Sequence, residues 1–254
     1  MEHRADLRLA LELADAADAV TLPLFRSSHL TIDTKSDSSP VSEADRGAEA
    51  IIRTLLEEHR PADGILGEEF GETGDSGRRW ILDPIDATVN YIRGVPVWGT
   101  LIALEEEGEV TVGVISSPAL GMRWWAARGL GSWENGRRLA VSNVDRLQDA
   151  YLSFNSITDH EAQGLGDAAL ALSRRCARTR GYGDFWSFMM LAGGSIDIVV
   201  EPIAAIWDLA PLIVIVEEAG GTFTALDGTR TIVGRNALAT NGALHATALE
   251  ALAG

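Results

Sequence analysis

The spacing of apolar residues along the chain predicts a mixture of helices and strands. Within residues 5–25, apolar side chains recur at helical spacing, which predicts an amphipathic helix; they are Leu7, Ala10, Leu11, Ala14 and Ala17. A second amphipathic helix is expected after a polar stretch, and it carries Ile51, Ile52, Leu55 and Leu56. The chain is therefore expected to begin with two helices, each of which must pack its apolar face against another element.

Strand patterns follow these helices. Residues 99–116 predict two strands joined by the turn EEEGE, and residues 123–139 predict another pair with Asn135-Gly136 as a hairpin turn. Beyond residue 145 the order changes to a strand over 150–154, a helix over 161–177, a helix from about 184 and a strand over 195–202. We therefore expect an α/β (α+β) chain with two αβ halves, 1–145 and 146–254, packed as one compact unit.

Residues 211–221, PLIVIVEEAGG, leave the choice between helix and strand open on periodicity alone. The run of β-branched residues favours a strand, whereas Pro211 in a first turn and Gly220-Gly221 as a stop favour a helix. We expect a helix here.

Composition and charge narrow the function classes. The chain has 254 residues, 46% of them hydrophobic, and a formal charge of −16, so its average surface repels nucleic acid and anionic lipid. An acidic protein that handles an anionic substrate needs cations to reverse the field locally. Cys176 is the only cysteine, which excludes an intrachain disulfide and suits the cytoplasm.

No membrane-spanning or targeting segment is expected. Acidic residues interrupt the apolar positions of the N-terminal helix, so it does not resemble a signal peptide. The most apolar later stretch, residues 202–216, contains Asp208 and is shorter than the roughly 20 residues that span a bilayer.

Residues 80–91, WILDPIDATVNY, raise the main chemical question, because Asp83 and Asp86 lie three apart at the end of an apolar run. We expect residues 80–82 to form a buried strand that Pro84 ends, and Asp86 to cap a helix that starts at Ala87. Like charges about 4 Å apart repel by about 4 kcal/mol at an effective dielectric near 20, unless a cation lies between them. The alternative is that Asp86 only caps the helix and Asp83 faces solvent.

Two other segments also place acidic residues directly after apolar ones. Glu68 and Glu69 follow the apolar run of residues 64–67, and Asp208 precedes the apolar residues 209–216. No cluster of His or Cys accompanies these carboxylates, and ligation by oxygen alone favours Mg²⁺ or Mn²⁺ over zinc. The sequence thus predicts a magnesium site built from separate segments.

In their order and spacing, GEE at 67–69, WILDPIDATVNY, WD at 207–208 and the following EEAGG resemble the inositol-monophosphatase-like, magnesium-dependent and lithium-sensitive phosphatases. The resemblance covers essentially the whole chain and implies a layered αβαβα sandwich. Within the family, YIRGVPVWGTLIAL and RGYGDFWSFMMLAGGSIDIVVEP are most similar to histidinol-phosphate phosphatases of the actinobacterial type. This implies hydrolysis of L-histidinol phosphate in histidine biosynthesis by a homodimer.

The resemblance also implies roles for individual residues. Glu68, Asp83 and the Ile85 carbonyl resemble the ligands of a first Mg²⁺, and Asp83, Asp86 and Asp208 those of a second, with a third, weaker ion near Glu68 and Asp45. Asp45 and Thr88, with Glu68, are the expected catalytic residues, which orient a metal-activated water so that no phosphoenzyme forms. The implied substrate contacts are Lys35, Ala87, Thr88, Asp184, Glu201 and Asp208.

Several of these residues also have simpler structural explanations. Asp45 lies where a capping box with Ser42 would use it, and Lys35 lies in a polar loop where it could be solvated. An acidic residue at Asp184 suits a leaving alcohol that carries an ammonium group and an imidazole, and Glu201 resembles a family glutamate that contacts the alcohol part of the substrate. Inositol 1-phosphate or another small alcohol phosphate is the alternative substrate.

The chain departs from the family pattern at two positions. Ala87 stands where the family has glycine in its D-G-T motif, and Val89 stands where histidinol-phosphate phosphatases commonly have lysine. An alanine at position 87 is harmless in helical geometry but costly if the backbone φ must be positive. This keeps open a catalytically weak, metal-binding homologue. A phosphatase with an aspartyl nucleophile is disfavoured, because its signature has one residue between the carboxylates and this chain has two.

Overall fold

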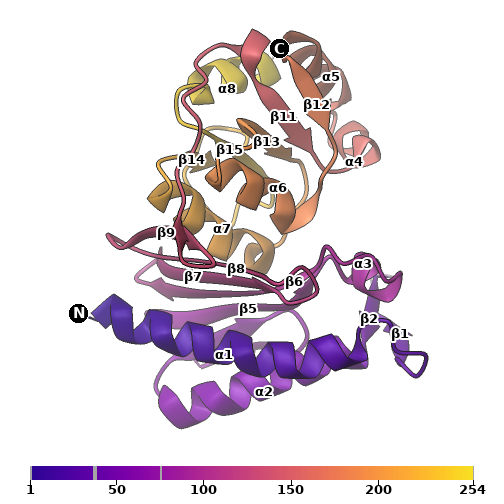
Figure 1. Cartoon of the computed structure of the whole chain (residues 1–254), viewed down its shortest axis with the longest axis vertical. Helices are drawn as coiled ribbons and strands as arrows, with labels where there is room; N and C mark the ends of the chain where they lie inside the picture. Colours follow the sequence, from indigo (N-terminus) through magenta and orange to yellow (C-terminus); the bar gives the residue numbers. More distant parts are fainter. Residues whose placement is uncertain (1, 37–38, 75, 254) are drawn as a thin grey trace. The chain divides into compact units, whose positions relative to one another are not determined.

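The computed structural model describes residues 2–36, 39–74 and 76–253 (Figure 1). The chain divides into two compact units, Met1–Arg128 and Gly129–Gly254. Among the described residues, no helix is both long and apolar enough to span a membrane.

Unit 1 combines helices with a mixed sheet. Its helices are α1 (Glu2–Leu24), α2 (Glu43–His59) and α3 (Thr88–Ile92). Its strands are β1 (Ile32–Thr34), β2 (Pro40–Ser42), β3 (Gly64–Gly67), β4 (Gly71–Thr73), β5 (Arg78–Asp86), β6 (Gly99–Glu106), β7 (Glu109–Ser117) and β8 (Met122–Ala127). The sheet order is β8-β7-β6-β5-β3-β4, with β3 and β5 parallel and the other pairs antiparallel. The two N-terminal helices and the two strands expected over residues 99–116 are confirmed.

The helices α1 and α2 lie side by side along one face of this sheet (Figure 1). Ala10, Ala14 and Ala17 of α1 are fully buried, as the amphipathic pattern predicts, whereas Leu7 and Leu11 are only partly buried and Leu13, outside the predicted stripe, is fully buried. At the start of α2, the Ser42 N–H donates to Asp45 Oδ2 at 2.8 Å and the Ala44 N–H donates to Ser42 Oγ at 3.2 Å. This capping box fixes where α2 begins, and so fixes Asp45 in its first turn.

Unit 2 also places helices against a mixed sheet. Its helices are α4 (Ile157–Ala162), α5 (Gly166–Arg175), α6 (Asp184–Ala192), α7 (Ile206–Glu218) and α8 (His245–Ala253), with a 3₁₀ turn at Leu147–Asp149. Its strands are β9 (Gly131–Glu134), β10 (Arg137–Arg138), β11 (Tyr151–Phe154), β12 (Arg178–Arg180), β13 (Ile198–Glu201), β14 (Thr222–Thr224) and β15 (Ala237–Thr240). One sheet has the order β12-β11-β13-β15-β14, in which β11 is parallel to both β12 and β13.

Two expectations for this unit are confirmed. Residues 211–218 do belong to a helix, α7, and Gly220-Gly221 lie just beyond its end. Pro211 lies inside this helix and not in its first turn, because α7 already begins at Ile206. Residues 209–216 are all buried, which explains why the apolar residues show no one-sided pattern. Asn135 and Gly136 join β9 to β10 with φ values of 46° and 84°, the geometry of a tight hairpin turn.

The single helix expected over residues 161–177 is wrong. The segment contains the end of α4 and all of α5, and Gly164 between them has a φ of +72° that a continuing helix excludes. Residues 178–180 then form β12, which the polar sequence RTR did not indicate. Pairing with β11 organises this strand, and an apolar face does not.

The division between the units falls after Arg128, whereas the sequence pattern placed it near residue 145. The segment between those positions is anchored within unit 2. The carboxylate of Glu218 accepts hydrogen bonds from the N–H groups of Gly129 at 3.0 Å and Gly131 at 2.8 Å, and the Val141 N–H donates to the Ala219 carbonyl at 3.1 Å. These bonds to the end of α7 join the β9–β10 hairpin to the second unit.

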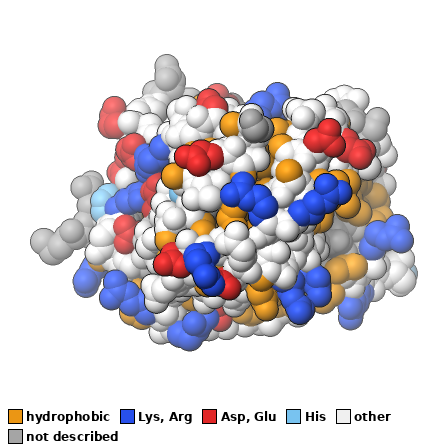
Figure 2. Space-filling view, turned by 90° about the horizontal axis from the view of Figure 1, so that it is seen from above, with side chains coloured by type: hydrophobic (Ala, Val, Ile, Leu, Met, Phe, Trp, Pro, Cys, Tyr) orange, Lys and Arg blue, Asp and Glu red, His pale blue; other side chains and the backbone are white. Residues whose placement is uncertain are grey.

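Charged side chains of both signs are interspersed on the face of the molecule drawn in Figure 2. The formal charge of −16 is therefore not spread as a uniform acidic coat over that face. A local reversal of sign is compatible with such a surface.

Candidate functional site

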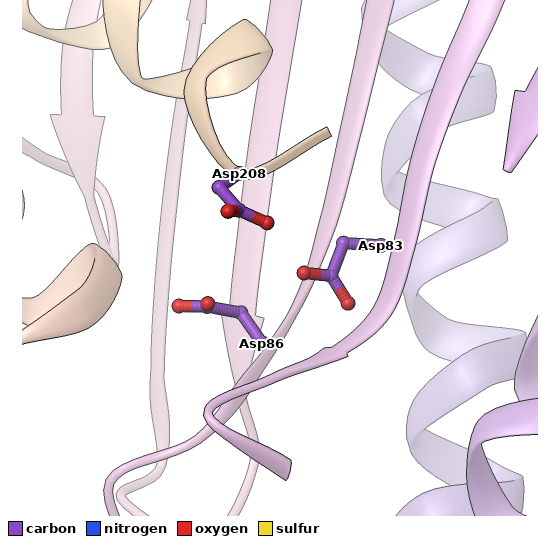
Figure 3. A group of neighbouring side chains, drawn as sticks. All are labelled: Asp83, Asp86 and Asp208. Atoms are coloured by element: carbon purple, nitrogen blue, oxygen red, sulfur yellow. The ribbon is translucent and has the colours of Figure 1, made fainter. Parts of the chain in front are cut away.

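The candidate site in unit 1 lies where two neighbouring parallel strands end. Glu68 directly follows β3, and its N–H donates to the Leu82 carbonyl of β5 at 3.2 Å. Asp83 and Asp86 occupy the last residues of β5, with side chains on the same side of the ribbon (Figure 3). Parallel strands bring their carboxyl ends to one edge of a sheet, so acidic residues from distant parts of unit 1 meet there.

The prediction that Pro84 ends the strand is wrong. The strand β5 runs through Pro84 to Asp86, and its pairing with β6 shifts register between Asp83 and Asp86. A proline is tolerated at such a bulge because no ladder N–H is needed there. In a regular strand, residues three apart point to opposite faces, so the bulge also explains how Asp83 and Asp86 can face the same way.

The two carboxylates are crowded and removed from solvent. Asp83 is 2% and Asp86 9% exposed, and one carboxylate oxygen of each lies within 4.8 Å of the other. Asp83 Oδ1 also accepts a hydrogen bond from the Ile85 N–H at 3.0 Å. Crowding of this kind is repulsive by about 3 to 4 kcal/mol at an effective dielectric near 20, and a divalent cation removes the conflict.

The prediction that Asp86 caps the following helix is also wrong. Asp86 still belongs to β5, and the cap position of α3 is taken by Ala87, whose φ is 63° and ψ 46°. The Ala87 side chain makes no capping hydrogen bond. The chain turns directly from strand into helix at one left-handed residue, which is the geometry in which alanine is costly.

Asp45 and Thr88 are brought together, as the resemblance implied. The Thr88 hydroxyl lies 2.9 Å from the Ile85 carbonyl oxygen and 3.3 Å from Asp45 Oδ1. Asp45 is fully buried; burial raises the pKa of its carboxyl, the hydrogen bonds from Ser42 oppose the rise, and the charge of Glu68 adds to it. Because Ser42 uses Oδ2 and Thr88 faces Oδ1, capping and a catalytic role are compatible for Asp45.

Lys35 is engaged with carboxylates and is not a freely solvated loop residue. Its Nζ lies 2.7 Å from Glu68 Oε1 and 2.6 Å from Glu69 Oε1. Burial alone would lower the pKa of Lys35, but the hydrogen bonds to Glu68 and Glu69 raise it above its ordinary value. Glu68 therefore faces an ammonium group.

Unit 2 carries the remaining predicted residues. Asp208 lies in the first turn of α7, where its Oδ2 accepts a hydrogen bond from the Ala205 N–H at 2.7 Å. Figure 3 labels it together with Asp83 and Asp86. Its carboxylate is thus fixed at a helix start that favours negative charge.

Asp184 and Glu201 form a second acidic pair. Glu201 ends β13 and is 5% exposed, whereas Asp184 begins α6 with a φ of 48°. Burial, followed by the charge of Asp184, raises the pKa of Glu201 to about 8. Burial also raises the pKa of Asp184. Two acidic groups that disfavour each other's charge at a strand end are suited to a cationic ligand.

Asn155 was not predicted from the sequence. This residue directly follows β11, and its side chain lies close enough to Glu201 to oppose the rise in the pKa of that carboxyl. The available signal was the one that found Asp83: a polar residue immediately after an apolar strand, here residues 150–154.

Comparison with known proteins gives a consistent result. Residues 4–253 match the profile described as the inositol monophosphatase family. The chain is 51% identical to a histidinol-phosphatase of Streptomyces coelicolor, over 96% of this chain and 95% of the relative, and 49% identical to a histidinol-phosphatase of Mycobacterium tuberculosis, over 97% of both. The solved structure of an inositol monophosphatase from Zymomonas mobilis matches with a TM-score of 0.88 and 36% identity, over 100% of this chain and 99% of the other. The expected layered fold is confirmed.

Proposed function

The chain belongs to the inositol monophosphatase family and is a phosphoric monoester hydrolase, and we propose that its substrate is L-histidinol phosphate, which it hydrolyses to L-histidinol and phosphate in histidine biosynthesis. The observation that carries this proposal is the similarity of about half of all residues, along nearly the whole chain, to two histidinol-phosphatases. A relative named inositol-1-monophosphatase, from Mesorhizobium japonicum, is 35% identical over 79% of this chain. Inositol 1-phosphate is therefore the less favoured substrate.

The acidic pair of unit 2 supports the same choice. L-histidinol carries an ammonium group and an imidazole, both of which present N–H donors, whereas inositol carries only neutral hydroxyls. Asp184 and Glu201 offer carboxylate oxygens in a buried setting, which suits a cationic alcohol. We assign these two residues to the alcohol part of the substrate.

The donors in the chain fit magnesium. The candidate ligands are Glu68, Asp83, Asp86, Asp208 and the Ile85 carbonyl. All offer oxygen, the ligand type that Mg²⁺ and Mn²⁺ prefer. Asp83 and Asp86 are buried within 4.8 Å of each other, which is unfavourable without a cation. We propose two or three ions per site, with Asp83 as the shared ligand; when bound, these ions supply Lewis-acid stabilisation of the phosphoryl charge.

The other residues of unit 1 have proposed roles around the phosphate. The Asp45 carboxylate accepts a proton from the attacking water. The Thr88 hydroxyl, which lies 3.3 Å from Asp45 Oδ1, orients the same water. Backbone N–H groups of Ala87 and Thr88, at the turn into α3, are the proposed phosphate donors. Lys35 contributes positive charge to the phosphate once it leaves Glu68. None of these roles requires a covalent phosphoenzyme.

The test is a comparison of specificity constants. The purified protein is assayed for phosphate release from L-histidinol phosphate, inositol 1-phosphate and glycerol 2-phosphate, each with Mg²⁺ and with a chelator. We expect Mg²⁺-dependent hydrolysis in which kcat/KM for L-histidinol phosphate exceeds the other two by at least about a hundredfold. A preference for inositol 1-phosphate would overturn the substrate, and no Mg²⁺-dependent release from any ester would favour a catalytically weak metal-binding homologue.

Two further quantities are open to direct measurement. Calorimetric titration with Mg²⁺, without and with inorganic phosphate, counts the ions, and we expect two without phosphate. Sedimentation equilibrium tests the proposed homodimer.

A further inference from the structure

Three parallel strands of unit 2 end at one edge of their sheet. The strand β11 lies between β12 and β13 and is parallel to both, so the residues after all three strands lie at the same edge. Asn155 follows β11, the segment leading to Asp184 follows β12, and Glu201 is the last residue of β13. The neutral residue Asn155 thus lies at the same edge of the sheet as the acidic pair Asp184 and Glu201.

Asn155 lies next to Glu201 and next to the turn that leads to Asp184. Its side chain lies beside Glu201 and acts to lower the pKa of that carboxyl against the effect of burial. Its Oδ1 lies 3.0 Å from where a Cβ on Gly183 would be, and Gly183 has a φ of +77°. The asparagine therefore packs closely against the turn that presents Asp184, and only glycine at position 183 allows that approach.

One carboxylate oxygen of Glu201 lacks a hydrogen-bond donor within the part of the chain that the structure describes. Asn155 and the Ile203 backbone lie close enough to Glu201 to oppose the rise in its pKa, yet Oε1 of Glu201 is buried without a hydrogen-bond partner among the described residues. Glu201 itself is 5% exposed, so solvent reaches its side chain poorly. A buried acceptor left without a donor is costly, and a ligand that donates an N–H would remove this cost.

We infer that Asn155 is a specificity-determining positioning residue, which holds one side of the Glu201 carboxylate so that Oε1 and the nearby Asp184 face the N–H donors of a cationic alcohol. The inference rests on the proposed function, and it concerns the alcohol part of the substrate alone. The role of Asn155 is indirect, because it acts through Glu201. A neutral alcohol can donate a hydroxyl hydrogen bond to Oε1, but it gains less from the arrangement because it brings no positive charge to the acidic pair.

The alternative is that Asn155 only stabilises the turn after β11. In that case, its loss weakens the fold of unit 2 and lowers the turnover of every ester to the same extent. The ratio of kcat/KM for the two substrates separates the two roles, because structural damage lowers the turnover of a cationic and of a neutral alcohol phosphate alike.

The first experiment compares Asn155→Ala with the unmodified enzyme on L-histidinol phosphate and inositol 1-phosphate. We expect kcat/KM for L-histidinol phosphate to fall by about tenfold, mainly through KM, while the value for inositol 1-phosphate stays within about twofold. The matched control is Asn236→Ala. Asn236 is a half-buried asparagine of the same unit whose Oδ1 accepts from the Leu226 N–H at 2.8 Å, and its loss should leave the substrate ratio unchanged.

A double-mutant cycle with Glu201→Gln tests whether Asn155 acts through Glu201. If it does, the pair of substitutions costs L-histidinol phosphate turnover no more than Glu201→Gln alone. Binding of the product L-histidinol, measured by calorimetry with Mg²⁺ and phosphate, should weaken by about tenfold in Asn155→Ala and be unaffected in Asn236→Ala.

The outcomes separate this inference from the proposed function. Failure of the unmodified enzyme to prefer L-histidinol phosphate overturns the proposed function, whatever the variant does. An enzyme that shows this preference, but whose Asn155→Ala variant loses both substrates equally or gives additive effects in the cycle, overturns the role of Asn155 alone. A selective and non-additive loss supports both.

Discussion

The ammonium group of Lys35 lies 2.7 Å from Oε1 of Glu68, one of the carboxylates proposed to bind magnesium. The same Nζ lies 2.6 Å from Glu69 Oε1. Lys35 is also the only lysine in the sequence. The single positive charge of Lys35 thus offsets half of the charge of two neighbouring carboxylates, and a divalent cation that binds Glu68 must compete with it.

Replacing Lys35 with methionine should therefore tighten magnesium binding in the absence of substrate. The substitution removes the competing charge and keeps an unbranched side chain of similar length. We expect the dissociation constant at the Glu68 site to fall by about three- to tenfold, measured by calorimetric titration of the substrate-free protein. Weaker binding in the variant would contradict the competition.

Arg46→Met is the matched control, because Arg46 pairs with Asp33 at 2.6 Å at the exposed surface of the same unit. Its loss should change magnesium affinity by less than about twofold. The single lysine also allows a direct readout. After reductive methylation with ¹³C-formaldehyde, Lys35 gives the only side-chain amine signal, and magnesium should shift it.

The crowded carboxylates of β5 give a second prediction. Asp83→Asn should lower Mg²⁺-dependent phosphate release by at least about a thousandfold, because it removes the shared ligand. The fold should survive, since the asparagine carbonyl can still accept the Ile85 N–H bond. Thermal unfolding provides the control: magnesium should raise the melting temperature of the unmodified protein and of Asp15→Asn, an exposed substitution in α1, but not that of Asp83→Asn. Near-normal rates in Asp83→Asn would refute the metal assignment.

Ala87 stores backbone strain at the entrance to α3. Its φ of 63° and ψ of 46° lie in the left-handed region, which costs an L-residue about 1 to 2 kcal/mol, whereas glycine adopts it freely. Ala87→Gly should raise the free energy of unfolding by about 0.5 to 1 kcal/mol, after the larger entropy of the unfolded glycine chain is subtracted. Urea denaturation measures it. Ala168→Gly, within the helix α5, should lower stability by a similar amount, and a loss in Ala87→Gly would contradict the strain.

Ala87 also shows where sequence reasoning stopped. Asp83 and Asp86 were identified because acidic residues at the end of an apolar run are unusual. In the structure they do lie close together at the end of β5. The path of the backbone between them was not found. The bulge at Pro84 depends on the pairing of β5 with β6, where the hydroxyl of Thr100, 16 residues along the chain, donates to the Pro84 carbonyl. No local pattern in the sequence encodes that pairing.

The same limit applies in unit 2. Periodicity identified α6, β11 and β13, because their apolar residues are buried, yet it merged α4 and α5 and missed β12. Asn155 was missed for a related reason. Its neighbours Glu201 and the turn at Gly183 become adjacent only through the parallel pairing of three strands, whose order a single sequence does not reveal.

Asp184 offers a test of substrate charge that leaves the backbone undisturbed. Its φ of 48° is tolerated well by asparagine and poorly by alanine, so Asp184→Asn removes the charge without adding strain. We expect kcat/KM to fall by about tenfold or more for L-histidinol phosphate and by much less for inositol 1-phosphate. Specificity constants for both substrates, with Asp159→Asn of α4 as the control, measure the effect. Equal losses would argue against a cationic leaving group.

Glu201 should make stability depend on pH. Burial, followed by the charge of Asp184, raises its folded-state pKa to about 8, against an ordinary value of 4.5. Between these values the folded state binds the proton more tightly than the unfolded chain does, so the contribution to stability is full below pH 4.5 and is lost as pH rises toward 8. Glu201→Gln, which stays neutral, removes this dependence. In metal-free buffer, the unmodified protein should lose on the order of 3 kcal/mol more of its free energy of unfolding between pH 5 and pH 8 than Glu201→Gln does. Urea titrations at both pH values measure the difference, and parallel profiles for the two proteins would show that Glu201 is ionised throughout this range.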